Sequence, residues 1–378
     1  MFTRSKLAAI AFGACLAGAQ EKAPEARSLW KIDFPKDSPV SVVSADWGES
    51  RTTARGSAMV LDLRTSLSLR NSGLRRIRGV TLQVLAQEVT PGGRASVSVP
   101  ALHVAPGETF PVRIDLRLLR PLLVGGGPLV EVSLDGVLFD DLSFFGPNRL
   151  NSRRSMTAWE LEARRDRRHF KSVLETEGEG ALQQVMLESL ARQAQRPRLD
   201  VQVLHGGRAT NVPDGRPIQF AFLQLPGSPV EPLGGSALVA GNEARTPSLE
   251  VRNRSSRVVR YFEIGWLIQD AEGKEYLAGS VPVSDPNLRL RPGENWRALE
   301  AMTLRLASAP GRPLSIAGMT GFVSQVEFSD GTLWVPPRSA LKDQRVARAV
   351  APSPEEQRLL ELYRKRGLSA LVEEVKKF

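Results

Sequence analysis

The residues best able to do chemistry form a run of arginines near the middle of the chain. Four arginines occur within five positions, with Asp166 among them. Guanidinium groups make forked hydrogen bonds to carboxylates and phosphates, so this run could bind an acidic protein, an acidic glycan or lipid headgroups. A helix face in water, neutralised by Glu160 and Glu162, is the alternative. The predicted binding residues are Arg164, Arg165, Arg167 and Arg168.

The side chains that most enzymes use are scarce. The three histidines, His103, His169 and His205, lie far apart and have no second ligand at helical or hairpin spacing. The sequence contains no Gly-x-Ser-x-Gly, Gly-Lys-Ser/Thr or His-Glu-x-x-His motif. We therefore predict no catalytic residue, no metal site and no cofactor. His103 alternates with Leu102 and Val104 and is predicted to face solvent.

Carboxylates leave one enzymatic alternative open. Two carboxylates beside an exposed tryptophan could hydrolyse a glycan. Two acidic clusters at predicted turns could bind calcium, but their spacing matches no calcium loop and favours ordinary turn residues. The clusters are Asp135, Asp140 and Asp141, and Asp270, Glu272 and Glu275.

The composition is that of a folded protein with a strong basic bias. The chain has 378 residues, of which 42% are hydrophobic and 24% charged. Its net charge of +10 comes from 41 arginines and only ten lysines. Such a charge favours acidic partners, although arginines spread along the whole chain also fit a GC-rich genome. Nucleic acid is an improbable partner for an exported protein.

The first 19 residues have the pattern of a secretory signal peptide. Arg4 and Lys6 precede an apolar run from Leu7 to Leu16, and Ala17-Gly18-Ala19 supplies the small residues of a cleavage site. We therefore expect export to the periplasm or beyond. A lipoprotein anchored through Cys15, the only cysteine, is the alternative. No transmembrane span is predicted, because no apolar run reaches about 20 residues.

Three short phrases occur twice in the same order. Repetition at this scale indicates one β-rich domain used twice. We expect Trp334 to correspond to Phe139, and Trp296 to Phe110, so that both tryptophans pack in cores. The phrases are Ser66 to Asn71 with Ser248 to Asn253, Leu102 to Glu108 with Leu288 to Glu294, and Val130 to Phe139 with Val326 to Trp334.

Apolar and polar residues alternate within each repeat. Leu61, Leu63, Leu67 and Leu69 show a period of two, which predicts a strand with one buried face. Turn signals recur about every ten residues, including Pro106-Gly107 and Asp135-Gly136. We therefore predict two antiparallel β-sandwiches, over residues 28–150 and 198–340.

The order of these signals resembles that of a known class of domains. A polar turn after Asn71, a Pro-Gly-Glu before a strand and a late hairpin are similar to the immunoglobulin-like domains common in bacterial exported proteins. The resemblance covers both repeats. It implies the sandwich architecture and no particular ligand.

Two segments change to a helical period. Residues 155–196 predict a helical hairpin or spacer, beginning at Thr157, whose spacing to Glu160 fits a capping box. Residues 353–378 predict an amphipathic helix with Ser353 as its cap and Pro354 in its first turn. We expect this last helix to dock on the second sandwich.

These observations predict a mainly β protein with a helical insert and a C-terminal helix. Its expected function is non-catalytic binding or scaffolding in the bacterial envelope, toward protein or acidic glycan or lipid partners. A carboxylate-dependent glycan hydrolase, or its auxiliary module, is one alternative. A two-domain periplasmic chaperone is the other.

Overall fold

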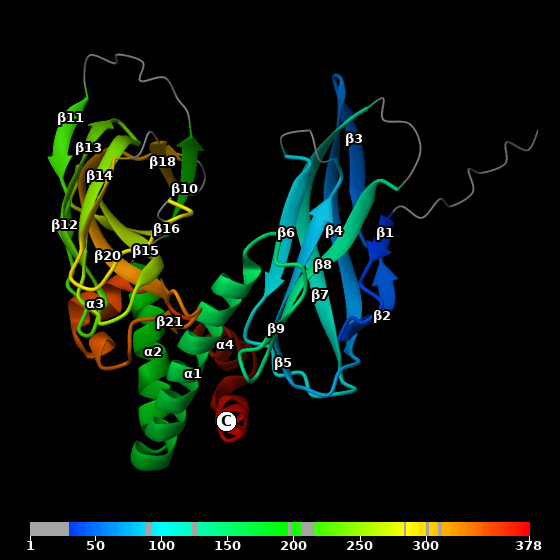
Figure 1. The fold of residues 1–378 in the computed structure, drawn as a ribbon. Helices are drawn as coiled ribbons and strands as arrows, with labels where there is room; N and C mark the ends of the chain where they lie inside the picture. The colour runs from blue at the N-terminus through cyan, green and yellow to red at the C-terminus, as the bar shows by residue number, and fades with distance from the viewer. Residues whose placement is uncertain are drawn as a thin grey trace, which may run out of the picture.

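The computed structural model describes residues 30–87, 92–122, 128–195, 198–205, 215–282, 285–299, 302–308 and 312–378. The predicted signal peptide (residues 1–19) and Cys15 lie outside these ranges. The described chain is mainly β, with several sheets and a few helices. Figure 1 shows two β regions, with helices α1 (Ser152–Glu177) and α4 (Pro354–Val375) between them.

Two sheets build the N-terminal β unit, which we define as residues 30–145. The first has the order β1 (Trp30–Asp33), β8 (Val130–Phe139), β5 (Ile77–Leu85) and β6 (Arg94–Val99), with β9 (Phe144–Phe145) also on β8. The second has the order β2 (Val40–Asp46), β4 (Ala58–Asn71) and β3 (Arg51–Arg55), with β7 (Thr109–Pro121) also on β4. Among the described strand pairs of this unit, β1 with β8 is parallel and the others are antiparallel.

The core of this unit comes from the predicted alternation. Leu61, Leu63, Leu67 and Leu69 of β4 are each at most 1% exposed, which confirms the period of two. They share one apolar cluster with residues of the other sheet, such as Leu82. The two sheets therefore enclose a common core, and burying its branched side chains drives their association.

The C-terminal β unit, residues 198–334, is a single connected sheet. Its main path is β11 (Arg216–Gln219), β13 (Val230–Ala240), β14 (Glu243–Asn253), β18 (Met302–Ser308), β10 (Arg198–His205), β16 (Glu275–Pro282), β15 (Val259–Asp270), β20 (Ile316–Phe328) and β12 (Ala221–Phe222). Side branches are β17 (Asn295–Leu299) on β14, β19 (Arg312–Pro313) on β18 and β21 (Leu333–Trp334) on β20.

The two units share strand pairings. Ile77 of β5 lies opposite Phe139 of β8, as Val259 of β15 lies opposite Phe328 of β20. In each unit a short strand, β1 or β12, joins this pair in parallel. The predicted match of Trp296 with Phe110 is confirmed by register. The supporting pairs are Leu69 with Phe110 and Val251 with Trp296.

A buried asparagine stabilises the same corner in each unit. Asn71 and Asn253 are both 0% exposed, and each side-chain amide donates to two backbone carbonyls. Each backbone N–H also pairs with a Pro-Gly-Glu turn, through the carbonyls of Glu108 and Glu294. The amide distances are 2.9 and 3.1 Å to Arg75 and Val104, and 2.7 and 2.9 Å to Arg257 and Leu290.

The third repeated phrase is aligned differently from the prediction. The shared feature is a hairpin, in which the N–H of Phe139 or of Phe328 donates to a carbonyl four residues later, at 3.0 Å in both units. Phe145 in β9 is therefore the counterpart of Trp334 in β21. The predicted match of Trp334 with Phe139 is wrong, because Asp135-Gly136 lies inside β8, whereas Asp330-Gly331 lies in the turn after β20.

Asp135 anchors helix α1 and does not turn the chain. The sequence predicts a reversal at Asp135 and Gly136, but both lie inside β8, where Asp135 is the extra residue of a β-bulge. Its carboxylate accepts a hydrogen bond of 2.5 Å from Ser152. The predicted helix start at Thr157, with Glu160 closing the cap, is therefore wrong: this anchor allows α1 to begin at Ser152.

Helices α2 and α4 pack on α1, whereas α3 packs on the C-terminal β unit. Helix α2 (Glu179–Gln195) follows it after a break at Gly178, whose φ of 87° favours glycine. A 3-10 turn (Ala340–Lys342) and α3 (Gln344–Ala349) follow the last strand. Ser353 caps α4 by accepting the N–H of Glu356 at 3.1 Å, as predicted.

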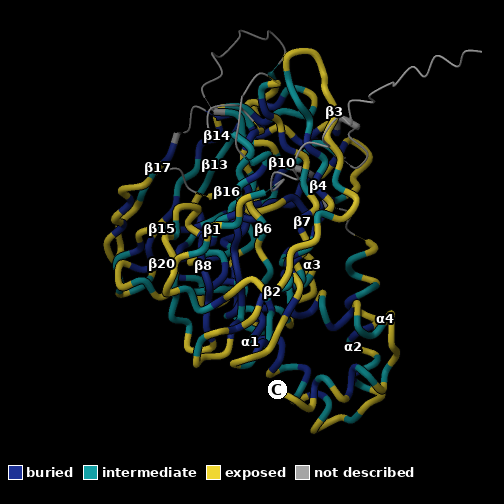
Figure 2. The backbone as a smooth tube through the Cα atoms, turned by 90° about the vertical axis from the view of Figure 1, so that its right-hand side faces the viewer, coloured by how far each residue is buried: buried dark blue, intermediate teal, exposed yellow. Residues whose placement is uncertain are grey.

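Helix α4 docks on the helical hairpin, which corrects the expectation that it docks on the second sandwich. Its apolar stripe shares one cluster with α1 and α2, including Phe170, Leu182, Leu359 and Leu371. A hydrophobic stripe packs on whatever complementary stripe lies nearest, and α1 and α2 supply one. Figure 2 shows buried residues in the interior of the molecule and exposed residues on the peripheral turns. Over the described residues, no helix is both long and apolar enough to cross a bilayer.

Replacing either buried asparagine should destabilise the protein by a similar amount. Asn71→Ala and Asn253→Ala each leave two buried carbonyls without a donor, which costs about 3 kcal/mol in total. Asn287→Ala, at an exposed turn, is the control and should change little. Urea unfolding followed by circular dichroism measures the difference. Equal stability of the Asn71 and Asn287 variants would contradict the role of the asparagine.

Candidate functional site

The arginines of the run in α1 lie on two sides of the helix: Arg165 faces the C-terminal β unit, and the others face the N-terminal β unit. Arg165 is 6% exposed, and its Nε and Nη2 donate to the two carboxylate oxygens of Asp166 at 2.8 and 2.9 Å. Its Nη1 donates to the carbonyl oxygen of Pro336 at 2.8 Å, just beyond β21. Arg338 adds a second cation 3.6 Å from Asp166. Arg165 therefore joins α1 to the C-terminal β unit.

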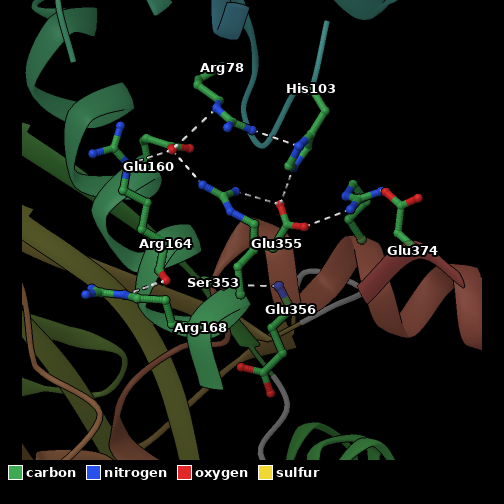
Figure 3. Close-up of polar contacts among 11 residues, drawn as sticks. Arg78, His103, Glu160, Arg164, Arg168, Ser353, Glu355, Glu356 and Glu374 are labelled. Atoms are coloured by element: carbon green, nitrogen blue, oxygen red, sulfur yellow. Dashed lines mark hydrogen bonds and ion pairs between the residues drawn. The ribbon is translucent and has the colours of Figure 1, made fainter. Parts of the chain in front are cut away.

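On the other side of α1, the carboxylate of Glu160 interacts with three arginines. Glu160 is 2% exposed, and its Oε1 accepts hydrogen bonds from Arg164 at 3.0 Å and Arg167 at 2.6 Å. Arg78 of β5 lies 3.7 Å from the same oxygen. Arg167 also donates to Glu355 at the start of α4, at 3.2 Å. Figure 3 shows this convergence of strand, helix and helix.

Glu355 is fully buried and continues the chain of charges. It accepts from Arg358 at 2.7 Å and from Nε2 of His103 at 3.4 Å. Nδ1 of His103 lies 2.7 Å from Arg78 and must accept, because a guanidinium can only donate. Burial raises the pKa of Glu355, but the hydrogen bonds from His103 and Arg358 outweigh it and hold that pKa at about 2. We call Arg78, Glu160, Arg167, Glu355 and Arg358 the ionic chain.

A basic cleft lies over the ionic chain. Its volume is about 800 Å³, and it is bounded by the N-terminal β unit, α1 and the segment after α4. Seven of its lining side chains are basic, whereas Asp140 is its one acidic lining residue among those described. The basic lining residues are Arg76, Arg78, Arg164, Arg167, Arg168, Lys171 and Lys377.

The basic side chains of the cleft differ in whether they form ion pairs with carboxylates of the protein. Arg167 is buried and paired with two carboxylates. Arg76 and Arg168 are exposed, and neither forms an ion pair with any described residue. Arg168 donates only to the carbonyl oxygen of Arg164, at 3.2 Å. The cleft therefore offers two unneutralised guanidinium groups on a framework of paired ones.

An aromatic side chain lines one end of the cleft. The ring of Phe378 stacks on His103 with centroids 5.8 Å apart, and Arg167 lies 5.9 Å from the centroid of the same ring. Lys171 of α1 donates to the backbone oxygen of Phe378. The imidazole stacks on Phe378 and has a hydrogen-bond partner at each nitrogen, so the prediction that His103 faces solvent is wrong.

The structure brings together three of the four predicted binding residues. Arg164, Arg167 and Arg168 line the cleft, whereas Arg165 faces the opposite side of α1. Sequence reasoning missed Arg76 and Arg78. A second basic run, residues 75–78, follows the repeated asparagine and could have indicated them.

The acidic clusters considered for calcium are turn and anchor residues. Asp141 accepts the N–H of Ser143 at 2.9 Å, and Asp270 accepts the N–H of Lys274 at 2.8 Å and the hydroxyl of Tyr276 at 2.9 Å. Within the described ranges, no three His, Cys, Asp or Glu side chains lie together as metal ligands.

Comparisons with known proteins give no family. No protein-family model matches the sequence, and no curated protein matches it. Among solved structures, red sea bream transglutaminase is similar over 76% of this chain and 31% of its own, at 10% identity and a TM-score of 0.13. A β-glucosidase from Kluyveromyces marxianus is similar over 72% and 45%, at 9% identity and a TM-score of 0.16. The chain thus spans less than half of either enzyme, and TM-scores this low give no basis for assigning an activity.

Removing the charge of Glu355 should destabilise the protein near neutral pH. Glu355→Gln removes one of the two carboxylates paired with Arg167 and one of the two paired with Arg358, leaving Glu160 and Glu374, which costs about 3 kcal/mol at most. Because the pKa of Glu355 is held at about 2, below its ordinary value of 4.5, the stabilisation is complete above pH 4.5 and is lost as pH falls toward 2. Urea unfolding at pH 7 and pH 3 measures both effects.

Glu361→Gln is the matched control for this prediction. It removes an exposed ion pair with Lys365 on the same helix, and such pairs contribute little. If the two variants unfold at the same urea concentration at pH 7, the ionic chain does not stabilise the fold.

Proposed function

We propose that the protein is a non-catalytic binding or scaffolding protein that holds an acidic partner in the basic cleft. The observation that carries this proposal is the excess of basic side chains in a cleft of about 800 Å³. Its β units would be immunoglobulin-like sandwiches, and the chain would be exported to the bacterial envelope. Protein, acidic glycan and lipid headgroups are all partners of the right charge.

The sandwich assignment is supported by the shared construction of the units. In the N-terminal unit two sheets enclose one core. The C-terminal unit repeats its pairings and its buried asparagine. In the C-terminal unit β10 pairs with both β16 and β18 and so links the two halves of the sheet. This link is a departure from a simple two-sheet sandwich.

Anion binding is supported by how the cleft is preorganised. Arg167 is fixed by two buried carboxylates, so its guanidinium loses little conformational freedom when a ligand arrives. Arg76 and Arg168 would supply the unneutralised charge. Guanidinium groups make forked hydrogen bonds to carboxylate, sulfate and phosphate oxygens.

The two alternatives place the function elsewhere. A chaperone would use an exposed strand edge of a β unit to pair with a client strand. A glycan hydrolase would need a tryptophan and two carboxylates in one cavity. Trp159, Glu162 and Glu263 line such a cavity on the far side of α1, and the experiment on that cavity below includes a hydrolysis assay.

Reversing the two free charges should weaken binding of acidic probes. The double variant Arg76→Glu, Arg168→Glu breaks no ion pair and should fold normally. It should lose at least about tenfold in affinity at low salt, and the wild-type affinity should fall as salt is added. Suitable probes are a poly-glutamate peptide, a sulfated oligosaccharide and vesicles containing phosphatidylglycerol, compared by titration.

Arg51→Glu, Arg55→Glu makes the same charge change on exposed strand β3 and is the control. The probe with the strongest cleft-dependent binding would identify the class of partner. Equal losses in both double variants would mean that net charge, and not the cleft, attracts the probes.

A further inference from the structure

A second cavity lies on the opposite side of α1 from the basic cleft. It has a volume of about 430 Å³ and is bounded by α1, the strands β15, β16 and β20, and the segment before α4. This volume is in the range of small-molecule sites. The polar and aromatic side chains that line it are Trp159, Glu162, Glu263, Ser280, Phe322, Ser324, Gln325 and Gln357.

Glu162 lines this cavity without a partner. It is partly buried, and no described residue donates a hydrogen bond to it or forms an ion pair with it. Arg165, the nearest cation in sequence, uses its donors on Asp166 and Pro336. A carboxylate taken from water without a donor or cation is unfavourable, and a ligand could supply either.

Glu263 places a second carboxylate in the same cavity. Its Oε1 accepts from the hydroxyl of Tyr261 at 2.5 Å and from the side-chain amide of Gln325. Both donors are neutral and lie on the same oxygen, which leaves Oε2 available. The hydroxyl of Ser324, also in the cavity, is 2.9 Å from that of Ser280.

We propose that this cavity binds a small organic cation, whose ammonium or guanidinium group lies between Glu162 and Glu263 and against the indole of Trp159. Two carboxylates facing one cavity attract a single positive charge with several donors. Indole is the aromatic group that binds organic cations most strongly. This inference concerns a different site from the basic cleft and does not depend on the function proposed for it.

The charges around Glu162 support the same ligand class. Desolvation is the main cause that raises the pKa of Glu162 to about 7; the negative charges of Asp166 on α1, Glu263 on β15 and Glu356 on α4 act in the same direction, and Arg165 acts against them. Desolvation also raises the pKa of Glu263, against its hydrogen bonds and the charge of Arg154. A bound cation would favour the ionised form of both, so binding near pH 7 should release protons.

The experiment is a calorimetric titration of the full chain with butylamine, with butan-1-ol as the neutral probe of the same length. We expect butylamine to bind at least about tenfold more tightly than butanol, and more tightly at pH 8 than at pH 5.5, because protons compete for Glu162 below its pKa. Titrations in two buffers of different ionisation enthalpy measure the proton release. N-acetyl-lysine methylamide tests whether the ammonium comes from a lysine side chain: tighter binding than butylamine would identify that source.

Glu162→Gln should reduce the proton release and the preference for the amine over butanol, since only Glu263 is then left to pair with the cation. Because the raised pKa makes ionised Glu162 unfavourable in the folded state, this variant should unfold at no lower temperature than the wild type at pH 8. Loss of binding in it could then not be attributed to misfolding. Glu272→Gln, at an exposed turn, is the control and should bind as the wild type does.

Two results would overturn the proposal. One is equal affinity for butylamine and butanol in the wild type. The other is hydrolysis of a chromogenic glycoside that Glu162→Gln abolishes, which would assign the cavity to the glycan-hydrolase alternative.

Discussion

A carboxylate that is fully removed from water must be neutralised by fixed cations, and Glu355 imposes this constraint on the whole molecule. Its partners come from the N-terminal β unit, from α1 and from α4 itself. A shift of the N-terminal unit or of α1 relative to α4 would remove one of the donors to this buried carboxylate. The position of α4, the shape of the basic cleft and the orientation of Arg167 therefore depend on one network. Its contacts are directional, whereas the apolar packing of α4 alone would tolerate sliding.

Features of the fold that arise from local patterns were predictable. The period of two in β4 and the cap at Ser353 depend on neighbouring residues, and both are confirmed. The equivalence of Asn71 and Asn253 was also readable, because the same side chain must satisfy the same two carbonyls in each unit. The start of α1 was not predictable, since its anchor Asp135 comes from a strand 17 residues earlier. A local capping motif at Thr157 cannot compete with such an anchor.

The site was predictable only in part, for a related reason. A run of arginines predicts a concentration of positive charge, but it does not show which arginines form ion pairs with the protein's own carboxylates. Arg165 and Arg167 are buried because Asp166, Glu160 and Glu355 pair with them. Glu355 is separated from Arg167 by 188 positions, and no spacing rule connects them. The free charge lies instead on Arg168 and on Arg76 of the N-terminal unit.

The repeat explains why the basic cleft and the second cavity, on opposite sides of α1, are lined by groups of opposite charge. Ile77 and Val259 occupy the same register in their units, so Arg78 and Arg260, one position later, are equivalent. Arg78 meets an acid supplied by the helix, Glu160. Arg260 meets an acid supplied by its own unit, Glu327, which also pairs with Arg154 of α1. The N-terminal unit therefore contributes an arginine that pairs with a carboxylate of α1. The C-terminal unit contributes a carboxylate that pairs with an arginine of α1. The excess of base on the first side forms the cleft, and Glu263 contributes the excess of acid on the second, so a single helix between two related units can present sites of opposite charge.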